Sequence, residues 1–269
     1  MIKNNSNGIV FYTFNNLVKE KNIKHLFSTR LGGVSKDQFA SMNLSFSRGD
    51  ETEKVRENFR RISGLGFPVE KMVFSDQAHG TEIRNVTESD CGKGILKKSD
   101  IIGVDGLMTN VPGVVLVTFF ADCVPLFFYD KVKNAIALSH AGWRGTLMEI
   151  GKITINKMKE EFGSRPSDIL VGIGPSICKK CFETGEEVTD MFLEKFSFAR
   201  EFITTGSSKG HIDLWGMNKQ ILIDSGVPAQ NIELPDLCTM CNTDLFYSHR
   251  VSGWERGNMA AFLSIQANS

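Results

Sequence analysis

The sequence predicts a mixed α/β or α+β fold in a single domain, and three observations support this. Strand-like apolar segments are interspersed with helix-like segments, and most strand candidates lie in the middle of the chain. The longest apolar runs, 113–123 and 125–130, are continuous, as is typical of buried strands. Because no internal repeat, low-complexity tract or obvious linker divides the 269 residues, we expect one domain over residues 1–269.

The first third of the chain predicts short strands, a glycine-rich loop and a helix. Residues 50–66 form the helix candidate, because acidic residues crowd its start, arginines crowd its end and Gly64 can cap it. Residues 71–86 indicate two short strands around a tight connection at 77–80. Two earlier strand candidates lie at 8–14 and 23–30, followed by the loop "RLGGVS".

The remaining elements follow the central apolar runs. Residues 135–140 predict a strand, and 146–162 predict a helix with one apolar face. Strand order cannot be read from these patterns. The later candidates are a buried strand and loop at 169–177, helices at 188–202 and 214–226, and strands at 244–250 and 259–265.

Composition restricts the class of protein. Lys plus Arg equals Asp plus Glu, at 31 each, so net charge gives no reason to expect nucleic acid or an anionic membrane as a partner. The N-terminus lacks the apolar stretch of a signal peptide, and Asp122 and Pro125 interrupt the longest apolar segment. We therefore expect a cytoplasmic protein that binds neither nucleic acid nor membrane. The oligomeric state is left open.

Six cysteines in a chain of this size do not indicate a disulfide scaffold. Two C-x-x-C pairs, Cys178 with Cys181 and Cys238 with Cys241, could together form a four-thiolate structural zinc site. The long gap between the pairs is unlike a zinc ribbon. Buried or scattered thiols are therefore the favoured interpretation, and the zinc site is the alternative.

The segment "ALSHAGWRGT" places His140 between an apolar run and a glycine-bearing loop that leads into a helix. Such a loop can direct backbone N–H groups and the positive end of the helix at one point. Gly142 and Gly145 permit close approach of another group, and Arg144 offers a planar donor suited to phosphate or carboxylate. These residues indicate a metal-binding or catalytic histidine beside an anion pocket.

Two further residues can join His140. Cys123 follows Asp122 between two very apolar runs, and a thiolate there needs a metal ion or an imidazolium to stabilise it. His79 stands on a polar turn before Gly80. Two histidines and one cysteine can form an open three-ligand zinc site, although their spacing matches no local zinc motif.

Other polar residues allow both a binding and a structural interpretation. Arg30 could bind an anion or cap a turn, and Asn43 could belong to a turn. Arg250 ends the segment "FYSHR" and could be a surface group.

Several segments occur in an order that resembles the laccase-domain family, also called the polyphenol oxidase family. The resemblance runs from about Thr29 to Leu263 and is most specific at "ADCVPL" and "HAGWRG". The other matching segments are "TRLGGVS", "FASMNLS", "QAHGTEI", "GIGPSIC" with "CFE", and "DLCT" with "LFYSHR".

The resemblance implies a layered α/β/β/α sandwich related to a cysteine-hydrolase toxin fold. It also implies zinc-dependent purine nucleoside phosphorylase activity together with adenosine deaminase activity, with a purine nucleoside and phosphate as substrates. The family's metal ligands correspond here to His79, Cys123 and His140.

These expectations translate into roles for individual residues. For deamination, a zinc-activated water would attack C6 of adenine while a carboxylate moves the proton, with Asp122 as the first candidate and Asp105 as the reserve. For phosphorolysis, Arg144 and the Gly142 to Gly145 amides would hold phosphate, helped by Arg30 or Arg250. Arg30, Asn43, Arg144 and Arg250 are thus the predicted substrate-binding residues.

Three alternatives belong to other classes. One is a metal-free cysteine hydrolase acting on peptide-like or cell-wall precursor amides, with Cys123 as nucleophile and His140 as base. Another is a copper polyphenol oxidase, which is disfavoured because five histidines are too few for a multi-copper centre. The third is a non-catalytic, metal-stabilised binding protein.

Overall fold

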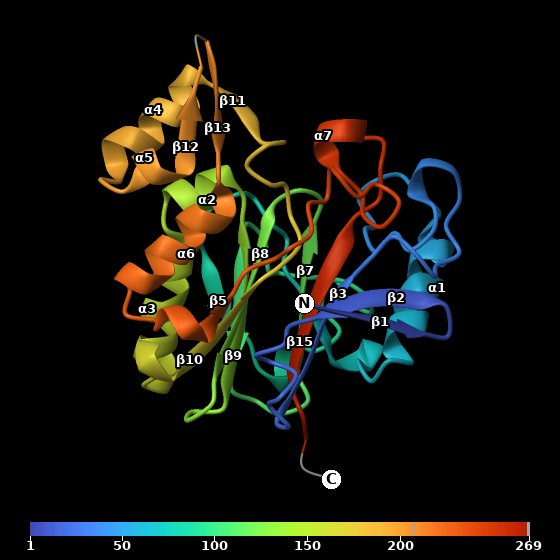
Figure 1. The fold of residues 1–269 in the computed structure, drawn as a ribbon. Coiled ribbons are helices and arrows are strands. Elements are labelled where there is room, and N and C mark those ends of the chain that lie inside the picture. The colour runs from blue at the N-terminus through green and yellow to red at the C-terminus, as the bar shows by residue number, and fades with distance from the viewer. Residues whose placement is uncertain (207, 268–269) are drawn as a thin grey trace.

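Two six-stranded sheets form the centre of the protein, seen here in a computed structural model that describes residues 1–206 and 208–267 (Figure 1). The first sheet has the order β1-β2-β3-β15-β7-β4 and the second β14-β10-β8-β9-β6-β5. The first comprises β1 (Ile2–Ser6), β2 (Ile9–Thr13), β3 (Ile23–Ser28), β4 (Met72–Phe74), β7 (Val115–Phe120) and β15 (Met259–Ile265). The second comprises β5 (Ile83–Asn85), β6 (Gly106–Thr109), β8 (Val124–Asp130), β9 (Ala135–Ala141), β10 (Ile169–Ile173) and β14 (Ile232–Glu233).

Alternate residues of each strand point to opposite sides of its sheet, so each sheet has an inner and an outer face. The two inner faces pack against each other. Leu116 of β7 and Phe127 of β8 belong to the same buried cluster between the sheets. Val117, next to Leu116, points to the outer face of the first sheet, and Phe128, next to Phe127, points to the outer face of the second. This alternation separates a central core from two outer cores.

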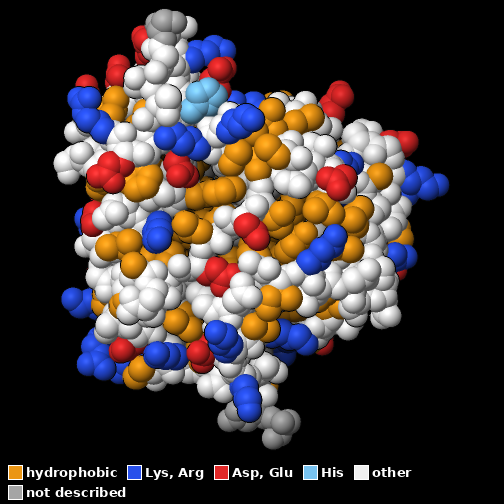
Figure 2. Space-filling view, in the orientation of Figure 1, with side chains coloured by type: hydrophobic (Ala, Val, Ile, Leu, Met, Phe, Trp, Pro, Cys, Tyr) orange, Lys and Arg blue, Asp and Glu red, His pale blue; other side chains and the backbone are white. Residues whose placement is uncertain are grey.

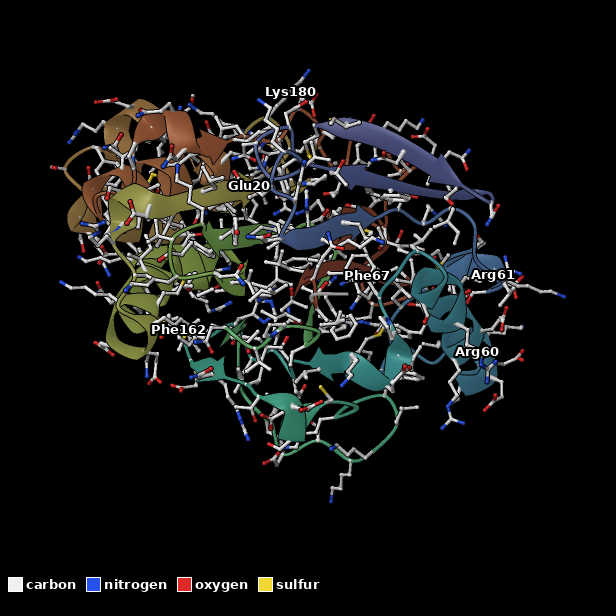
Figure 3. All side chains as sticks on the ribbon, turned by 90° about the horizontal axis from the view of Figure 1, so that it is seen from below. Glu20, Arg60, Arg61, Phe67, Phe162 and Lys180 are labelled. Atoms are coloured by element: carbon white, nitrogen blue, oxygen red, sulfur yellow. The ribbon has the colours of Figure 1, made fainter. Side chains whose placement is uncertain are left out.

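Helices cover both outer faces. Helix α1 (Thr52–Ser63) places Val55, Phe59 and Ile62 against the first sheet. On the opposite side, α3 (Ile150–Phe162) and α6 (Leu214–Asp224) cover the second sheet. Viewed from below, α1 lies at one side with Arg60 and Arg61 pointing into solvent (Figure 3). The expected α/β/β/α sandwich in a single domain is confirmed, whereas the relation to a toxin fold stays a prediction.

A smaller lobe stands at one end of the sandwich (Figure 1). Its three-stranded sheet has the order β11-β13-β12, and two short helices pack against it. Its elements are β11 (Glu183–Gly185), α4 (Glu186–Lys195), α5 (Ala199–Phe202), β12 (Ile203–Thr205) and β13 (Lys209–Ile212). The strand β11 also reaches the site described below.

Two predicted helices are interrupted. The helix expected at 146–162 is instead α2 (Trp143–Leu147) and α3, separated at Glu149, whose φ of 60° is left-handed. The helix expected at 188–202 is divided into α4 and α5 around Phe196, whose backbone is extended. In both cases the chain turns so that each piece can bury its own apolar face.

The strand predicted at 244–250 is wrong. This segment forms turns and then the short helix α7 (His249–Ser252). Phe246 and Tyr247 are buried, but a carboxylate of Asp122 holds the following backbone by accepting from Ser248 Oγ and Arg250 N. Side-chain hydrogen bonds thus replace a strand ladder here.

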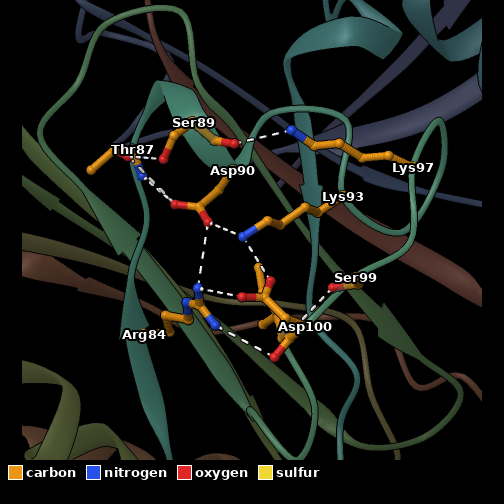
Figure 4. A network of polar contacts seen from close by, with 9 residues as sticks. Arg84, Thr87, Ser89, Asp90, Lys93, Lys97, Ser99 and Asp100 are labelled. Atoms are coloured by element: carbon orange, nitrogen blue, oxygen red, sulfur yellow. Dashed lines mark hydrogen bonds and ion pairs between the residues drawn. The ribbon is translucent and has the colours of Figure 1, made fainter.

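The connection from β5 to β6 is braced by a polar network (Figure 4). Lys93 Nζ lies 2.6 Å from Asp90 and 2.7 Å from Asp100, and Arg84 pairs with the same two carboxylates. These contacts join residue 84 of β5 to residues 90, 93 and 100 of the connection, which ends at Asp105. Asp105, the last residue of this connection, enters the site directly before β6.

Acidic and basic side chains are interspersed over the visible face of the molecule, with apolar patches between them (Figure 2). This distribution agrees with the balanced charge of the sequence. Among the residues that the structure describes, no helix is long and apolar enough to span a bilayer.

Candidate metal centre

His79, Cys123 and His140 come together from three separate segments. His79 lies between β4 and β5, and Cys123 lies in the three-residue connection from β7 to β8. Each of these connections leads from the first sheet to the second, and His140 sits near the end of β9 beside them. The Sγ atom of Cys123 and one ring nitrogen of each histidine all lie within 4.8 Å of one another.

The three side chains surround a small space. Cys123 Sγ lies 3.9 Å from His79 Nε2, and the two imidazole centroids are 4.9 Å apart with their planes at 78°. A Cβ atom on Gly142 would stand only 3.2 Å from Cys123 Sγ and 3.1 Å from His79 Cδ2. Glycine at position 142 thus keeps this space open, as a metal ion shared by the three residues would require.

Asp105 fixes two sides of this group. Its Oδ1 atom accepts from His140 Nδ1 at 2.9 Å and from the backbone N of His79 at 3.0 Å. Its Oδ2 atom accepts from the backbone N of Ala78 and of Gly80. In the neutral imidazole, donation from Nδ1 to Asp105 leaves the lone pair on Nε2, which is the form that a metal ligand needs.

The electrostatics favour a thiolate. Burial raises the cost of charge at both Cys123 and His140, but their mutual attraction outweighs it, so the pKa of the Cys123 thiol is lowered and that of His140 is raised. Burial likewise opposes charge on Asp105, yet the hydrogen bond from His140 and the backbone N–H groups hold the pKa of this carboxyl below its usual value. Ionised Cys123 is the form that binds metals.

The Asp122 carboxylate braces two other segments, one at Thr239 and one at 248–250. The φ of 82° at Asp122 is left-handed, so the strand is irregular here and the usual alternation of side chains does not apply. The carboxylate accepts from Thr239 Oγ1 at 2.6 Å, Ser248 Oγ at 3.0 Å and Arg250 N at 2.7 Å. These contacts use both carboxylate oxygens. The proton-transfer role expected for Asp122 stays a prediction.

Two cavities meet at His79 and Cys123, which line both, and His140 lines the first. The first has a volume of about 280 Å³ and the second about 390 Å³. The first cavity is lined by polar groups that include Ser47, Arg48, Gln77 and Arg256. The second is more apolar, and its walls include Trp143, Phe182, Val188 and Leu214 together with Arg144, Glu183, His249 and Arg250.

Arg48 and Arg256 are functional candidates that the sequence interpretation missed. Arg256 is 6% exposed, and its Nη1 donates to Gly257 O and to Asn258 Oδ1. The Nε atoms of both arginines are buried and lack a hydrogen-bond partner within the described part of the chain. Burial lowers the pKa of both guanidinium groups, to about 10 for Arg256, where the charge of Arg48 adds to the effect. Their one sequence signal was a position in the glycine-bearing loops "SFSRGD" and "WERGN".

The predicted substrate-binding residues divide into two groups. Arg144 and Arg250 line the second cavity, where their guanidinium groups lie over the rings of Trp143 and Phe182. Arg30 and Asn43 are outside both cavities.

Arg30 Nε donates to Ala40 O, and its Nη1 donates to Thr243 O. Asn43 is fully buried and accepts from the backbone N of Ser45 and of Asn258. Both residues join loops. The phosphate cradle expected at Gly142 to Gly145 stays a prediction, and Gly145 lies inside α2.

A family model described as "Multi-copper polyphenol oxidoreductase laccase" matches residues 24–266. The chain belongs to this family. A relative from Bacteroides thetaiotaomicron named "Purine nucleoside phosphorylase" is 37% identical over 256 residues, which are 94% of this chain and 95% of the relative. "Adenosine deaminase RL5", from an unknown prokaryotic organism, is 32% identical over 86% of this chain and 90% of its own. These relatives support an enzyme of the laccase-domain family.

A solved structure gives the same fold for another similar protein. The crystal structure of YlmD from Geobacillus stearothermophilus matches with a TM-score of 0.88 and 33% identity, and the match covers 98% of both chains. The mixed α/β architecture of this laccase-domain chain is therefore shared with it.

Proposed function

We propose that this laccase-domain protein is a zinc-dependent purine nucleoside phosphorylase, acting over residues 1–269 as one catalytic domain, and that it also deaminates adenosine. Relatives with both names support the two activities. The observation that carries the proposal is that two cavities adjoin at His79 and Cys123, with His140 lining the first. That first cavity also holds two arginines whose Nε atoms lack a hydrogen-bond partner among the described residues. A bisubstrate reaction needs two such adjoining spaces.

The donor set fits zinc. Thiolate sulfur and imidazole nitrogen are preferred zinc ligands, and three protein ligands are typical of a catalytic site that keeps a position open for substrate or water. When bound, zinc supplies Lewis acidity at the junction of the two cavities. Copper fits less well, because only two of the five histidines belong to a potential ligand group.

Phosphate is assigned to the first cavity. The buried Nε donors of Arg48 and Arg256 are unsatisfied, which is costly unless an anion accepts from them. Phosphate held there would approach C1′ of a nucleoside in the second cavity from the side opposite the base. The new bond joins a phosphate oxygen to C1′, while the bond from C1′ to the purine nitrogen breaks and its electron pair leaves with the base.

The nucleoside is assigned to the second cavity. Trp143 and Phe182 offer aromatic surface for a purine, and Arg144 and Arg250 offer donors for ribose hydroxyls. A leaving purine needs a proton, which His249 would supply from Nε2 in its imidazolium form, because Gly253 O engages only its Nδ1 atom. For deamination, a carboxylate must accept a proton, and Glu183 lines this cavity with its pKa held low by a hydrogen bond from Lys209.

The first experiment is an assay of zinc-loaded protein with adenosine, with and without phosphate, read by mass spectrometry. Phosphate-dependent release of free base and ribose 1-phosphate supports phosphorolysis, and inosine formed without phosphate supports deamination. The Arg256→Gln variant should raise the KM for phosphate at least about tenfold, since a charge-assisted hydrogen bond is worth about 1.5–3 kcal/mol. Arg165→Gln, an exposed arginine paired with Asp168, is the matched control. Adenosine that stays intact in every arm would overturn the proposal.

One geometric observation favours a second candidate, a cysteine hydrolase. Asp105, His140 and Cys123 form the acid, imidazole and thiol series of a cysteine nucleophile, with the carboxylate on His140 Nδ1. A metal-free hydrolase would not need His79. Loss of activity in His79→Ala together with loss of bound zinc therefore favours the phosphorylase, whereas amidase activity that survives both favours the hydrolase.

A further inference from the structure

The cysteines of the two C-x-x-C pairs lie together in one group, so the expectation of scattered thiols is wrong for these four residues. The Sγ atoms of Cys178, Cys181, Cys238 and Cys241 are all within 4.8 Å of one another, and those of Cys181 and Cys241 are 3.3 Å apart. All four are free thiols, whereas a disulfide needs an S–S distance of about 2.05 Å. A zinc ion with Zn–S bonds of about 2.3 Å in a tetrahedron would separate its sulfurs by about 3.8 Å. The spacing fits four thiolates around one ion.

The two C-x-x-C segments have the same local form. Each turns back on itself: Phe182 N donates to Cys178 O at 2.9 Å, and Asn242 N donates to Cys238 O at 3.1 Å. The backbone N of Cys178 also donates to Cys238 Sγ at 3.3 Å, which favours a thiolate there. Two such turns facing each other are how four-cysteine zinc sites are commonly built.

The surroundings suit the charge of such a site. One zinc ion with four thiolates carries a net charge of about −2. The two residues inside the first turn are Lys179 and Lys180, and Lys180 projects from the surface (Figure 3). Arg250 Nη1 donates to Cys181 O at 3.3 Å and to Glu183 O at 3.0 Å, which brings a third positive charge nearby. Nearby cations reduce the electrostatic cost of the anionic cluster.

The cluster is joined to the catalytic region through the backbone. Thr239, inside the second turn, donates to Asp122 Oδ1 at 2.6 Å, and Ile177 N, just before the first turn, donates to Asp122 O at 3.0 Å. The residues that follow Cys181, from 182 to 185, form part of the wall of the second cavity. Anything that locks the two turns together therefore also fixes this wall.

We propose that a second, structural zinc ion binds through four thiolates, supplied by Cys178, Cys181, Cys238 and Cys241. Binding replaces the four S–H bonds by Zn–S bonds, and the protons pass to solvent. The ion fastens the chain after β10 to the chain after β14 and so holds the wall of the second cavity in place. It takes no part in the chemistry at His79, Cys123 and His140.

The test uses the full-length protein and measures metal content and ligand type, independently of catalysis. Zinc per chain is measured by mass spectrometry after exchange into chelator-treated buffer, and the ligands are identified by zinc X-ray absorption. We expect about two zinc ions per wild-type chain. Cys123→Ala should retain about one zinc ion, with sulfur as its only ligand type.

A double variant, Cys181→Ser with Cys241→Ser, should lose that all-sulfur zinc and about half of the total. Cys91→Ser is the matched control, because Cys91 is half-buried and belongs to neither ligand group. If the double variant does not fold, the spectrum of Cys123→Ala decides alone. A Cys123→Ala protein that is free of zinc, or whose zinc is bound by nitrogen or oxygen, overturns the proposal. So does a denatured mass that reveals disulfides among the four cysteines. None of these outcomes depends on phosphorolysis.

Discussion

Replacing Asp105 by asparagine tests whether this carboxylate orients the metal ligands. Asp105 is fully buried and accepts four hydrogen bonds, two on each oxygen. Asparagine has nearly the same shape but only one oxygen, and its NH₂ group is a donor. Every placement of the amide therefore puts a donor where two donors already point.

Each of the two placements damages the site in its own way. With the NH₂ group at the Oδ2 position, it faces the N–H groups of Ala78 and Gly80, and the turn that carries His79 loses two hydrogen bonds. With the NH₂ group at the Oδ1 position, it faces His140 Nδ1 and the N–H of His79. The imidazole of His140 can then accept only by moving its proton to Nε2, which removes the lone pair that would bind metal.

The expected effects follow from these lost contacts. Loss of an outer partner of a metal-binding histidine typically lowers metal affinity by about 10- to 100-fold, or about 1.4–2.7 kcal/mol. Stability should fall by about 3 kcal/mol or more, because two hydrogen bonds to a charged acceptor are lost at about 1.5–3 kcal/mol each. Zinc affinity is measured by competition with a chromogenic chelator, and stability by urea unfolding of the metal-free protein.

Asp130→Asn is the matched control. Asp130 is also fully buried, and its Oδ1 accepts from the backbone N of Val132 and of Lys133. It lies at the far end of β8, about 20 Å from the end next to Cys123. Asparagine can keep its oxygen at the Oδ1 position and place its NH₂ group at the Oδ2 position, which has no hydrogen-bond partner among the described residues, so this variant should leave zinc affinity unchanged. An Asp105→Asn protein that is folded and binds zinc within twofold of the wild type would refute the reasoning.

Three further predictions concern pH, space and bracing. Burial lowers the pKa of His25 from 6.5 to about 4, against the opposing influence of Glu233, so the unfolded chain takes up a proton that the folded chain refuses. Stability should therefore fall by up to about 3 kcal/mol between pH 6.5 and 4. Urea unfolding of His25→Leu should show a shallower dependence over that range, and an identical slope would contradict the assignment. Gly142→Ala should lower zinc affinity at least about tenfold, because the added Cβ atom would lie 3.2 Å from Cys123 Sγ. Calorimetry measures this affinity, and an unchanged value would show that the ligand group does not need this space. Thr239→Val should lower the free energy of unfolding by about 1.5–3 kcal/mol in thermal or urea unfolding, because a buried oxygen of Asp122 loses the hydroxyl that donates to it at 2.6 Å. An unchanged free energy of unfolding would mean that Asp122 is held in place without this hydrogen bond.

Most of the strands and helices could be predicted from periodicity and composition. The segments at 113–123, 125–130 and 259–265 are strands because their apolar residues are buried on both faces, a condition visible in the sequence as unbroken apolar runs. The division of these strands between two sheets could not be predicted. β4 and β5 are neighbours along the chain but belong to different sheets, and nothing in their composition distinguishes them.

The false strand at 244–250 has a specific cause. Its central run, 245–247, is apolar like the middle of a short buried strand, but a side chain far away in the sequence holds the backbone that follows. Asp122 holds Ser248 Oγ and Arg250 N from a distance of more than 120 positions. Pattern analysis detects which residues are buried and does not detect which remote groups satisfy the backbone.

The position of the site explains why its ligands could be predicted and its other residues could not. His79 and Cys123 lie where the chain passes from one sheet to the other, and a polar group at such a crossing interrupts an apolar pattern visibly. Arg48 and Arg256 lie in loops of ordinary composition, and only the folded chain brings them to the first cavity, where their burial is evident.

The four cysteines of the C-x-x-C pairs are in part visible in the sequence and in part brought together only by the fold. Each C-x-x-C turn is visible locally, but their meeting depends on β10 and β14 being parallel neighbours, so that both strands deliver their following turns to the same edge of the second sheet. The isolated bridge between Ser176 and Cys238 continues that pairing to the first cysteine of the second turn. A parallel pairing between remote segments thus brings two weak motifs together as one four-cysteine group, and it places that group beside the wall of the cavity that we assign to the nucleoside.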